Sequence, residues 1–247
     1  MTDALFLAPL DSPQVGEDVF VAGDEGRHAV VVRRIHVGES VFVADGHGRA
    51  IHGEVTSAEK SGLRVRVGEV LVEEVPAVEV VAVQALAKNG RDEQAIEAMT
   101  EVGVSGVVPW RASRSIVKWE SGPRGVRQLE KWRTTVREAA KQSRRFRVPD
   151  VTGPVTTGEL CGLVASSDAA FILHEDATGT LASIELPRQG RVLLVIGPEG
   201  GISPDELASL IAAGGRPVTV ARHVLRSSTA GVVALAQLQA LLERAGG

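Results

Sequence analysis

Hydrophobic and polar residues follow one pattern up to about residue 75 and a different pattern after it. In the first part, short apolar runs are separated by turn residues, and Leu63, Val65 and Val67 alternate with arginines. Alternation with a period of two is typical of a strand with one buried face. Residues 45–48, Asp-Gly-His-Gly, are typical of a hairpin turn. The pattern predicts an all-β module, with strands over residues 18–21, 28–36, 40–44, 50–56 and 63–71.

After a polar connector at residues 70–78, predicted strands alternate with predicted helices. The strands are expected over 78–86, 107–110, 169–173, 191–196 and 218–221, and the helices over 92–102, 124–143, 204–213 and 228–244. Such alternation is typical of an α/β fold, in which helices cover both faces of a largely parallel sheet. We therefore expect two domains, residues 1–75 and residues 76–247.

Composition narrows the class of protein. The 247 residues, 44% of them hydrophobic, suffice for two globular domains. A single cysteine, Cys161, excludes an intrachain disulfide framework, and no dense Cys/His spacing indicates a metal site. Residues 1–10 lack a basic region and a long apolar run, so we expect neither a signal peptide nor a membrane span, and a cytoplasmic location.

Charge is distributed unevenly along the chain. The net charge is −4, yet residues 111–147 contain 12 Lys and Arg against 3 Asp and Glu. This excess indicates a surface that faces a polyanion on an otherwise acidic protein, although a solvated helix face would produce the same count.

The densest chemical signal is the segment at residues 195–206, where a strand leads through Gly197-Pro198-Glu199-Gly200-Gly201 into a helix. Ser203 and Glu206 form a capping-box pattern, and the glycines allow close approach of a ligand to the backbone. Glu199 would repel a phosphate, so a ligand with cationic character is favoured over a nucleotide phosphate. Two other junctions, at residues 173–175 and 220–230, also follow strands, and three such loops on one sheet edge predict a pocket.

The order of these motifs resembles the RsmE-type family of small-subunit (16S) ribosomal RNA (uracil-N3) methyltransferases, within the SPOUT superfamily. The resemblance covers nearly the whole chain. The residues that carry it include Lys88-x-x-Arg91, Glu101-Val102-Gly103-Val104, Arg114-Ser115, Glu138-Ala139-Ala140-x-Gln142-Ser143-Arg144, Ile196 to Gly201, and Leu225-Arg226 through Thr229-Ala230. It implies an N-terminal PUA-like β-barrel that helps to hold RNA, a C-terminal domain with a trefoil knot, S-adenosylmethionine as cofactor, and a homodimer.

The resemblance, together with the three loops, indicates which residues bind the cofactor. They are Leu173, Ile196, Gly197, Glu199, Gly200, Gly201, Leu225, Ser227, Ser228 and Thr229. The chain departs from the family at Ser228, where relatives often carry glutamate, and at His223, where they often carry arginine. Arg226 is expected to stabilise negative charge on the uracil ring, and His223 is the candidate general base.

RNA contacts beyond the target base are expected, because the N3 edge is occupied in a duplex and the uridine must be unpaired or extruded. The predicted helix at 124–143 has one apolar face and one basic face suited to phosphates. The expected RNA-binding residues are Arg33, Arg34, Lys88, Arg91, Arg124, Arg127, Lys131, Arg144 and Arg145. The substrate could be ribosomal RNA or an assembled small subunit. A non-catalytic RNA-binding module and, less well supported, a nucleotide-binding oxidoreductase remain as alternatives.

Overall fold

The computed structural model describes residues 3–120 and 122–246, which form two compact units. The first unit contains residues up to 75 together with residues 140–148, and the second contains residues 76–139 and 149 onward. The division predicted at residue 75 did not include the short segment 140–148 in the first unit.

The first unit is built on a five-stranded sheet with the order β1-β3-β4-β5-β2. Its strands are β1 (Ala4–Leu7), β2 (Asp18–Ala22), β3 (Ser40–Ala44), β4 (Arg49–Glu59) and β5 (Gly62–Val72). β1 pairs parallel with β3, and the other pairs are antiparallel. The alternating residues Leu63, Val65 and Val67 are all buried, as their period predicts. The sequence interpretation missed β1, whose four residues are too few to show a period.

The strand predicted at residues 28–36 is wrong. The chain there forms the helix α1 (Gly23–Arg27) followed by one π-helical turn, η1 (His28–Val32). The β-branched run Val30-Val31-Val32 has strand-like composition, but Val31 and Val32 are 52% and 65% exposed while Ala29 is buried. α1 packs closely on the sheet, because a Cβ at Gly26 would overlap the carbonyl oxygen of Val21. Tertiary packing therefore overrides local propensity in this segment.

Polar contacts attach residues 140–148 to the rest of the first unit. The Glu73 carboxylate accepts hydrogen bonds from the backbone N–H groups of Phe146 (2.7 Å) and Arg147 (2.9 Å). Lys141 forms an ion pair with Glu25 at 2.9 Å, and both side chains are largely buried. Charged hydrogen bonds of this kind are stronger than neutral ones, so they compensate for the few apolar contacts that a short segment can make.

The second unit contains a six-stranded parallel sheet with the order β11-β9-β10-β6-β7-β8. The strands are β6 (Val78–Ala85), β7 (Gly106–Trp110), β8 (Asp150–Val151), β9 (Ala169–Leu173), β10 (Gly190–Ile196) and β11 (Arg216–Val218). The helices are α2 (Arg91–Val102), α3 (Pro123–Gln142), α4 (Thr157–Ala165), the short 3-10 turn η2 (Leu181–Ser183), α5 (Pro204–Ala212) and α6 (Ser227–Gly246).

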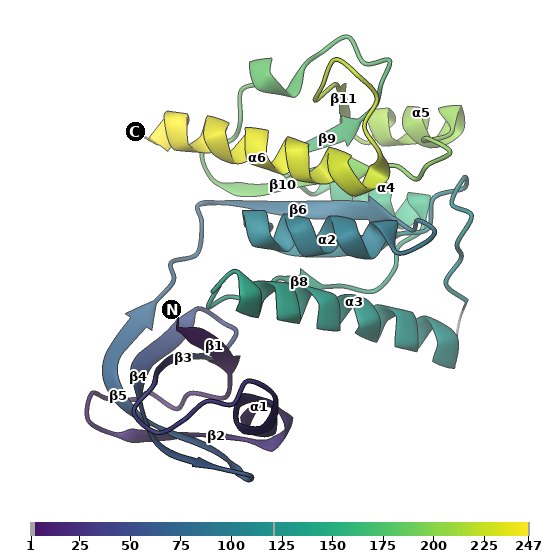
Figure 1. The fold of residues 1–247 in the computed structure, drawn as a ribbon. Helices are drawn as coiled ribbons and strands as arrows, with labels where there is room; N and C mark the ends of the chain where they lie inside the picture. The colour runs from purple at the N-terminus through teal and green to yellow at the C-terminus, as the bar shows by residue number, and fades with distance from the viewer. Residues whose placement is uncertain (1–2, 121, 247) are drawn as a thin grey trace. The chain divides into compact units, whose positions relative to one another are not determined.

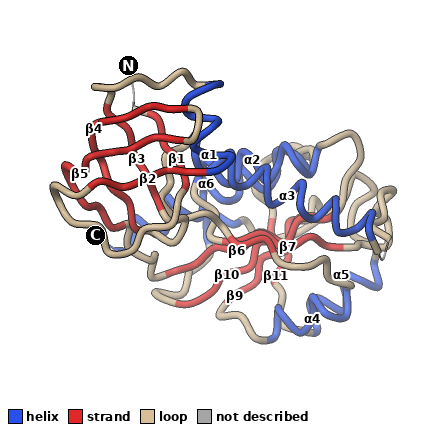
Figure 2. The backbone as a smooth tube through the Cα atoms, turned by 90° about the horizontal axis from the view of Figure 1, so that it is seen from below, coloured by secondary structure: helices blue, strands red, loops and turns tan. Residues whose placement is uncertain are grey.

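Helices cover both faces of this sheet (Figures 1 and 2). α4 and α5 pack on one face, where Leu160 and Leu210 join the buried strand residues. α2 and α6 lie side by side on the other face. The predicted α/β class is confirmed, and the four predicted helices match α2, α3, α5 and α6 to within two residues at each end. β8 and α4 were not predicted, and β11 begins two residues before the strand expected at 218–221. No helix within the described residues is long and apolar enough to cross a membrane.

We predict that Glu73→Ala loosens residues 146 and 147 from the first unit. The variant removes an acceptor shared by two backbone N–H groups, which should cost about 1–3 kcal/mol locally. Amide hydrogen exchange at Phe146 and Arg147 should accelerate accordingly. Glu74→Ala is the matched control, because Glu74 is the exposed neighbour. Equal exchange rates in the two variants would show that Glu73 does not hold the segment.

Candidate functional site

Four strand-to-loop junctions of the second unit meet at one edge of its sheet. Because β11, β9, β10 and β6 are parallel neighbours, the loops after them all leave from their carboxyl ends. A cavity of about 290 Å³ lies there. Its lining comes from the loops after β9 and β10, the segment before α6, and the first residue of α2. A smaller adjoining cavity of about 110 Å³ shares Leu173, His174 and Leu225 with it. The predicted pocket therefore exists at the predicted sheet edge.

The glycine-rich loop after β10 forms one wall of the larger cavity. The Gly201 N–H donates to the Pro198 carbonyl at 2.9 Å, and Gly201 adopts φ +71, which favours glycine. α5 begins immediately afterwards with the predicted capping box: Ser203 accepts from the Glu206 N–H, while the Glu206 side chain accepts from the Ser203 N–H. This arrangement fixes where the loop ends.

Glu206 also connects two further loops. Its carboxylate accepts from the Ser113 N–H (2.8 Å), the Ser113 hydroxyl (2.6 Å) and the Thr157 hydroxyl (2.8 Å), in addition to Ser203. Burial by itself would raise the pKa of Glu206, but the hydrogen bonds from Ser113, Thr157 and Ser203 outweigh it and hold the pKa below its ordinary value. One ionised side chain therefore joins the loop after β7, the start of α4 and the start of α5.

Glu199 does not present an uncompensated negative charge to the cavity. Its Oε1 accepts from the Lys88 N–H and from Nη1 of Arg91, both at 3.3 Å. The Arg91 and Glu199 side chains are 33% and 18% exposed, so the pair is partly screened from water. The sequence argument that Glu199 repels phosphate treated this carboxylate as isolated. The structure shows that a cation 108 residues earlier balances it.

Arg226 and Ser227 face the same cavity. Within the described residues, Arg226 makes no ion pair, and it is exposed. Its guanidinium is therefore available to a ligand. The Ser227 hydroxyl is buried and has no hydrogen-bond partner among the described residues. A buried polar group of this kind is suited to a ligand.

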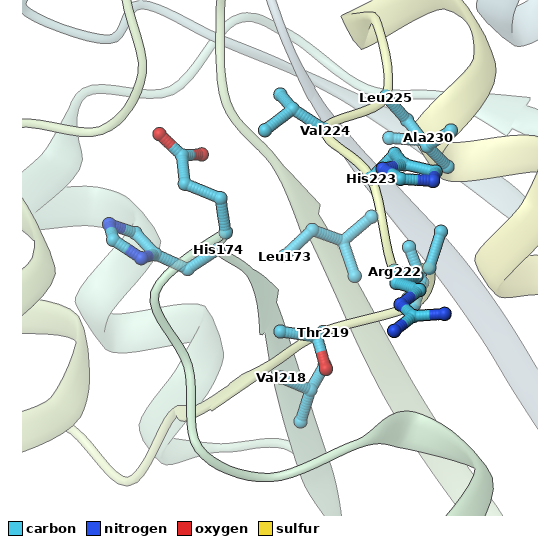
Figure 3. Close-up of a pocket in the computed structure, with 12 residues that line it drawn as sticks. Leu173, His174, Val218, Thr219, Arg222, His223, Val224, Leu225 and Ala230 are labelled. Carbon is cyan, nitrogen blue, oxygen red and sulfur yellow. The ribbon is translucent and has the colours of Figure 1, made fainter.

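Figure 3 shows the adjoining smaller cavity, with the apolar side chain of Leu173 between two histidines. His174 comes from the loop after β9, and His223 comes from the loop between β11 and α6. The Nδ1 atom of His174 accepts from the Asp176 N–H at 3.2 Å, which orients that ring. His223 is exposed, so its ring is accessible to solvent.

The cavities bring together most of the predicted cofactor residues and both predicted catalytic residues. Seven of the predicted cofactor residues line the larger cavity: Leu173, Ile196, Gly197, Glu199, Gly201, Leu225 and Ser227. Gly200 instead backs onto the loop after β7, where a Cβ would lie 3.3 Å from the carbonyl oxygen of Arg114. Ser228 and Thr229, in the first turn of α6, are not part of the lining. Arg226 lines the larger cavity and His223 the smaller one.

The predicted RNA-binding residues lie in several different places. Arg33 and Arg34 are exposed beyond η1 in the first unit. Arg124, Arg127 and Lys131 are exposed on α3, where Lys131 also pairs with Glu93. Arg144 and Arg145 are only half exposed, and burial lowers the pKa of Arg145. Lys88 and Arg91 lie beside Glu199 rather than on α3.

Sequence reasoning missed several residues of the lining. Pro198, Ile202, Val224 and Ala230 line the larger cavity, and Arg222 lines the smaller one. Their only sequence signal is adjacency to the predicted loops. The described residues contain no group of three or more His, Cys, Asp or Glu side chains placed to hold a metal ion.

Comparison with known proteins identifies the class of this site. A family model described as an RNA methyltransferase domain matches residues 73–239, and one described as an RNA methyltransferase PUA domain matches residues 21–68. The ribosomal RNA small subunit methyltransferase E of Mycobacterium bovis is 44% identical over 94% of this chain and 90% of its own length. The chain is thus an RNA methyltransferase with a PUA domain.

Solved structures are similar over the whole chain. A ribosomal RNA small subunit methyltransferase E from Neisseria gonorrhoeae, bound to S-adenosyl methionine, has a TM-score of 0.87 and 26% identity, with 97% and 98% of the two chains covered. A methyltransferase from Legionella pneumophila, in complex with the same cofactor, has a TM-score of 0.86 and 26% identity, with 98% of each chain covered. The protein belongs to the ribosomal RNA small subunit methyltransferase E family, as the resemblance predicted.

We predict that Glu206→Gln destabilises the second unit by about 1–3 kcal/mol at neutral pH, because it weakens several charge-assisted hydrogen bonds. The pKa of Glu206 is lowered in the folded protein, so its contribution is present above the ordinary glutamate pKa and is lost as pH falls through the lowered value. Urea unfolding should therefore show a difference from wild type that shrinks with acidification. Asp205→Asn, at the same helix end but exposed, should cost less than Glu206→Gln, and a pH-independent difference would contradict the role of ionised Glu206.

Proposed function

We propose that this protein transfers the methyl group of S-adenosylmethionine to N3 of a specific uridine in small-subunit (16S) ribosomal RNA. The observation that carries this proposal is the cavity lined by the consecutive residues Arg226 and Ser227. Among the described residues, the Arg226 guanidinium has no ion-pair partner and the buried Ser227 hydroxyl has no hydrogen-bond partner. Membership of the methyltransferase E family, and two similar structures that contain the cofactor, support the same reaction.

The residues of the cavity fit the cofactor. Leu173, Ile196 and Leu225 provide apolar surface for an adenine ring, and the Ser227 hydroxyl is available to a polar group of the ligand. The larger and smaller cavities, of about 290 and 110 Å³, share Leu173 and Leu225 in their linings. Bound there, S-adenosylmethionine would supply an electrophilic methyl group on a sulfonium.

Arg226 would act on the methyl acceptor. Uracil N3 becomes nucleophilic when it loses its proton, and the negative charge then spreads onto the two ring carbonyl oxygens. Arg226 lines the cavity and makes no ion pair within the described part of the chain, so its guanidinium is available to donate hydrogen bonds to those oxygens. A fixed donor placed where charge develops lowers the barrier to methyl transfer.

His223 is our candidate for the group that accepts the N3 proton. It lies three residues before Arg226, lines the adjoining cavity and is open to solvent, so it can pass the proton to water. An imidazole is the side chain that most often serves as a general base. Ser228, where relatives often carry glutamate, offers no carboxylate for this role.

The exposed cations of α3 would bind RNA phosphates. Trp132 and Val136 form the buried face of this helix, whereas Arg124, Arg127 and Lys131 are exposed. The apolar face is shorter than the sequence indicated, because Val126 is 60% exposed. Arg33 and Arg34 in the PUA-like unit would add further RNA contacts. Lys141, near the end of α3, is paired with Glu25, and Arg145, just beyond the helix, is half buried. This end of the basic segment therefore contributes less to binding than its sequence implies.

The family resemblance further implies a trefoil knot in the second unit, closure of the first sheet into a barrel, and a homodimer. Supporting the dimer, Val232, Val233, Leu241 and Leu242 of α6 remain only half buried, whereas Leu235 and Leu238 are fully buried. An enzyme of ribosomal RNA would work in the cytoplasm, on free RNA or on the assembled small subunit.

We predict different effects for the two catalytic candidates. Arg226→Ala should lower the single-turnover methylation rate about 100-fold at every pH, because an electrostatic donor is lost. His223→Gln should lower the rate by a smaller factor, because water at this exposed position can still accept the proton when the proposed base is lost. Arg244→Ala, at the exposed end of α6, serves as control. Wild-type rates in Arg226→Ala, with the product verified by mass spectrometry as N3-methyluridine, would exclude the proposed role.

We predict that neutralising Arg124, Arg127 and Lys131 together weakens RNA binding and reduces its salt dependence, because fewer counterions are released on binding. Cofactor affinity should stay at the wild-type value. The matched control neutralises Arg188, Arg191 and Arg216, which are exposed near the amino ends of β10 and β11 and change the net charge equally. The same salt slope in both triple variants would show that α3 is only a solvated surface.

We also predict a stable dimer at micromolar concentration, because dimerisation would cover the half-buried apolar residues of α6. Val233→Glu should shift sedimentation towards the monomer. An active, monomeric wild-type protein at that concentration would rule the dimer out.

A further inference from the structure

The ion pair between Arg91 and Glu199 has no role in the reaction described above. Both residues line the larger cavity, beside Arg226 and Ser227. Glu199 receives two donors on the same oxygen, the Lys88 N–H and Arg91 Nη1, each at 3.3 Å. Within the described residues, the second oxygen of Glu199 has no hydrogen-bond partner. The carboxylate is therefore held from one side and available to a ligand from the other.

The loop that carries Arg91 is itself firmly anchored. Asn89 and Gly90 both adopt left-handed conformations, with φ of +59 and +70, which turn the chain sharply between β6 and α2. The buried carboxylate of Asp92 accepts from the Ala87 N–H at 3.1 Å and fixes the start of this turn. Arg91 is consequently presented to Glu199 by a rigid segment, and little ordering is required to form the pair.

The charges that line the cavity balance one another. Arg91 and Arg226 contribute positive charge, and Glu175 and Glu199 contribute negative charge. This balance matters because the methyl donor carries a positively charged sulfonium, whereas the demethylated product, S-adenosylhomocysteine, has a neutral thioether in its place. An electrostatic field in the cavity therefore acts on the donor and the product differently, while apolar contacts act on both alike.

We propose that Arg91 is a specificity-determining residue, which neutralises Glu199 and thereby limits how strongly the cavity prefers the cationic methyl donor over its neutral product. This proposal rests on the cofactor assigned under the proposed function. It replaces the sequence-based assignment of Arg91 as an RNA contact. The chemical consequence is that donor and product bind with comparable strength, so that neither the entry of the donor nor the exchange of the product is dominated by charge.

The test is the ratio of the two dissociation constants, measured by calorimetry without RNA. Arg91→Met should raise the preference for S-adenosylmethionine over S-adenosylhomocysteine by about three- to tenfold at low salt, because Glu199 becomes uncompensated. Glu199→Gln should lower this preference, and the double variant should return close to the wild-type ratio. Arg91→Lys, which keeps the charge, should stay closer to wild type than Arg91→Met.

Lys88→Met is the matched control, because it removes a positive charge from the same loop but keeps the N–H that contacts Glu199. Its ratio should stay at the wild-type value. If Arg91→Met weakened the binding of both ligands equally, the ion pair between Arg91 and Glu199 would be merely structural, and the proposal would be wrong. If the ratio stayed unchanged while RNA binding became weaker, Arg91 would be an RNA contact, and the proposal would again be wrong. Failure of the wild-type protein to bind either ligand would contradict the proposed function itself.

Discussion

The parallel arrangement of the second sheet is the constraint on which the site depends. Parallel strands end at a common edge, so the loops after β6, β9, β10 and β11 meet although they are far apart in sequence. No single loop contains enough chemistry to bind and transfer a methyl group. Together they supply a cavity with both apolar and charged walls, a guanidinium that has no ion-pair partner among the described residues, a paired carboxylate and two histidines. The helices on both faces exclude water from the strands and leave this edge accessible.

Three carboxylates around the site are stabilised in three different ways. Glu206 receives hydroxyl and backbone donors, which together lower its pKa despite burial. Glu199 receives one backbone donor and a guanidinium. Asp92 receives only backbone donors, and burial raises its pKa. Carboxylates at the sheet edge therefore serve first to hold loops in place. Because protein donors compensate most of their negative charge, little of it acts on a ligand.

The local features of this protein could be predicted from its sequence, whereas the long-range pairings could not. The capping box at Ser203 and Glu206 marks the start of α5 in the sequence, and the same pattern at Thr156 and Glu159 marks α4, which the sequence interpretation overlooked. The β-branched run at 30–32 predicted a strand, because composition does not reveal that the preceding helix packs on Val21 and Gly62 through Gly26. Partners such as Arg91 and Glu199 are joined only by the fold, so no spacing rule reveals them.

The position of β10 in the middle of the sheet has a consequence for biosynthesis. β10 pairs with both β6 and β9, so β6 lacks one of its two neighbours until residues 190–196 have left the ribosome. Glu206 lies 93 residues after its partner Ser113, so the loop after β7 must also wait for its acceptor. Contacts between residues so distant in sequence form late and slowly during folding. The nascent second unit must therefore remain open through most of its translation, and the methyl-transfer site is completed only with the final helix.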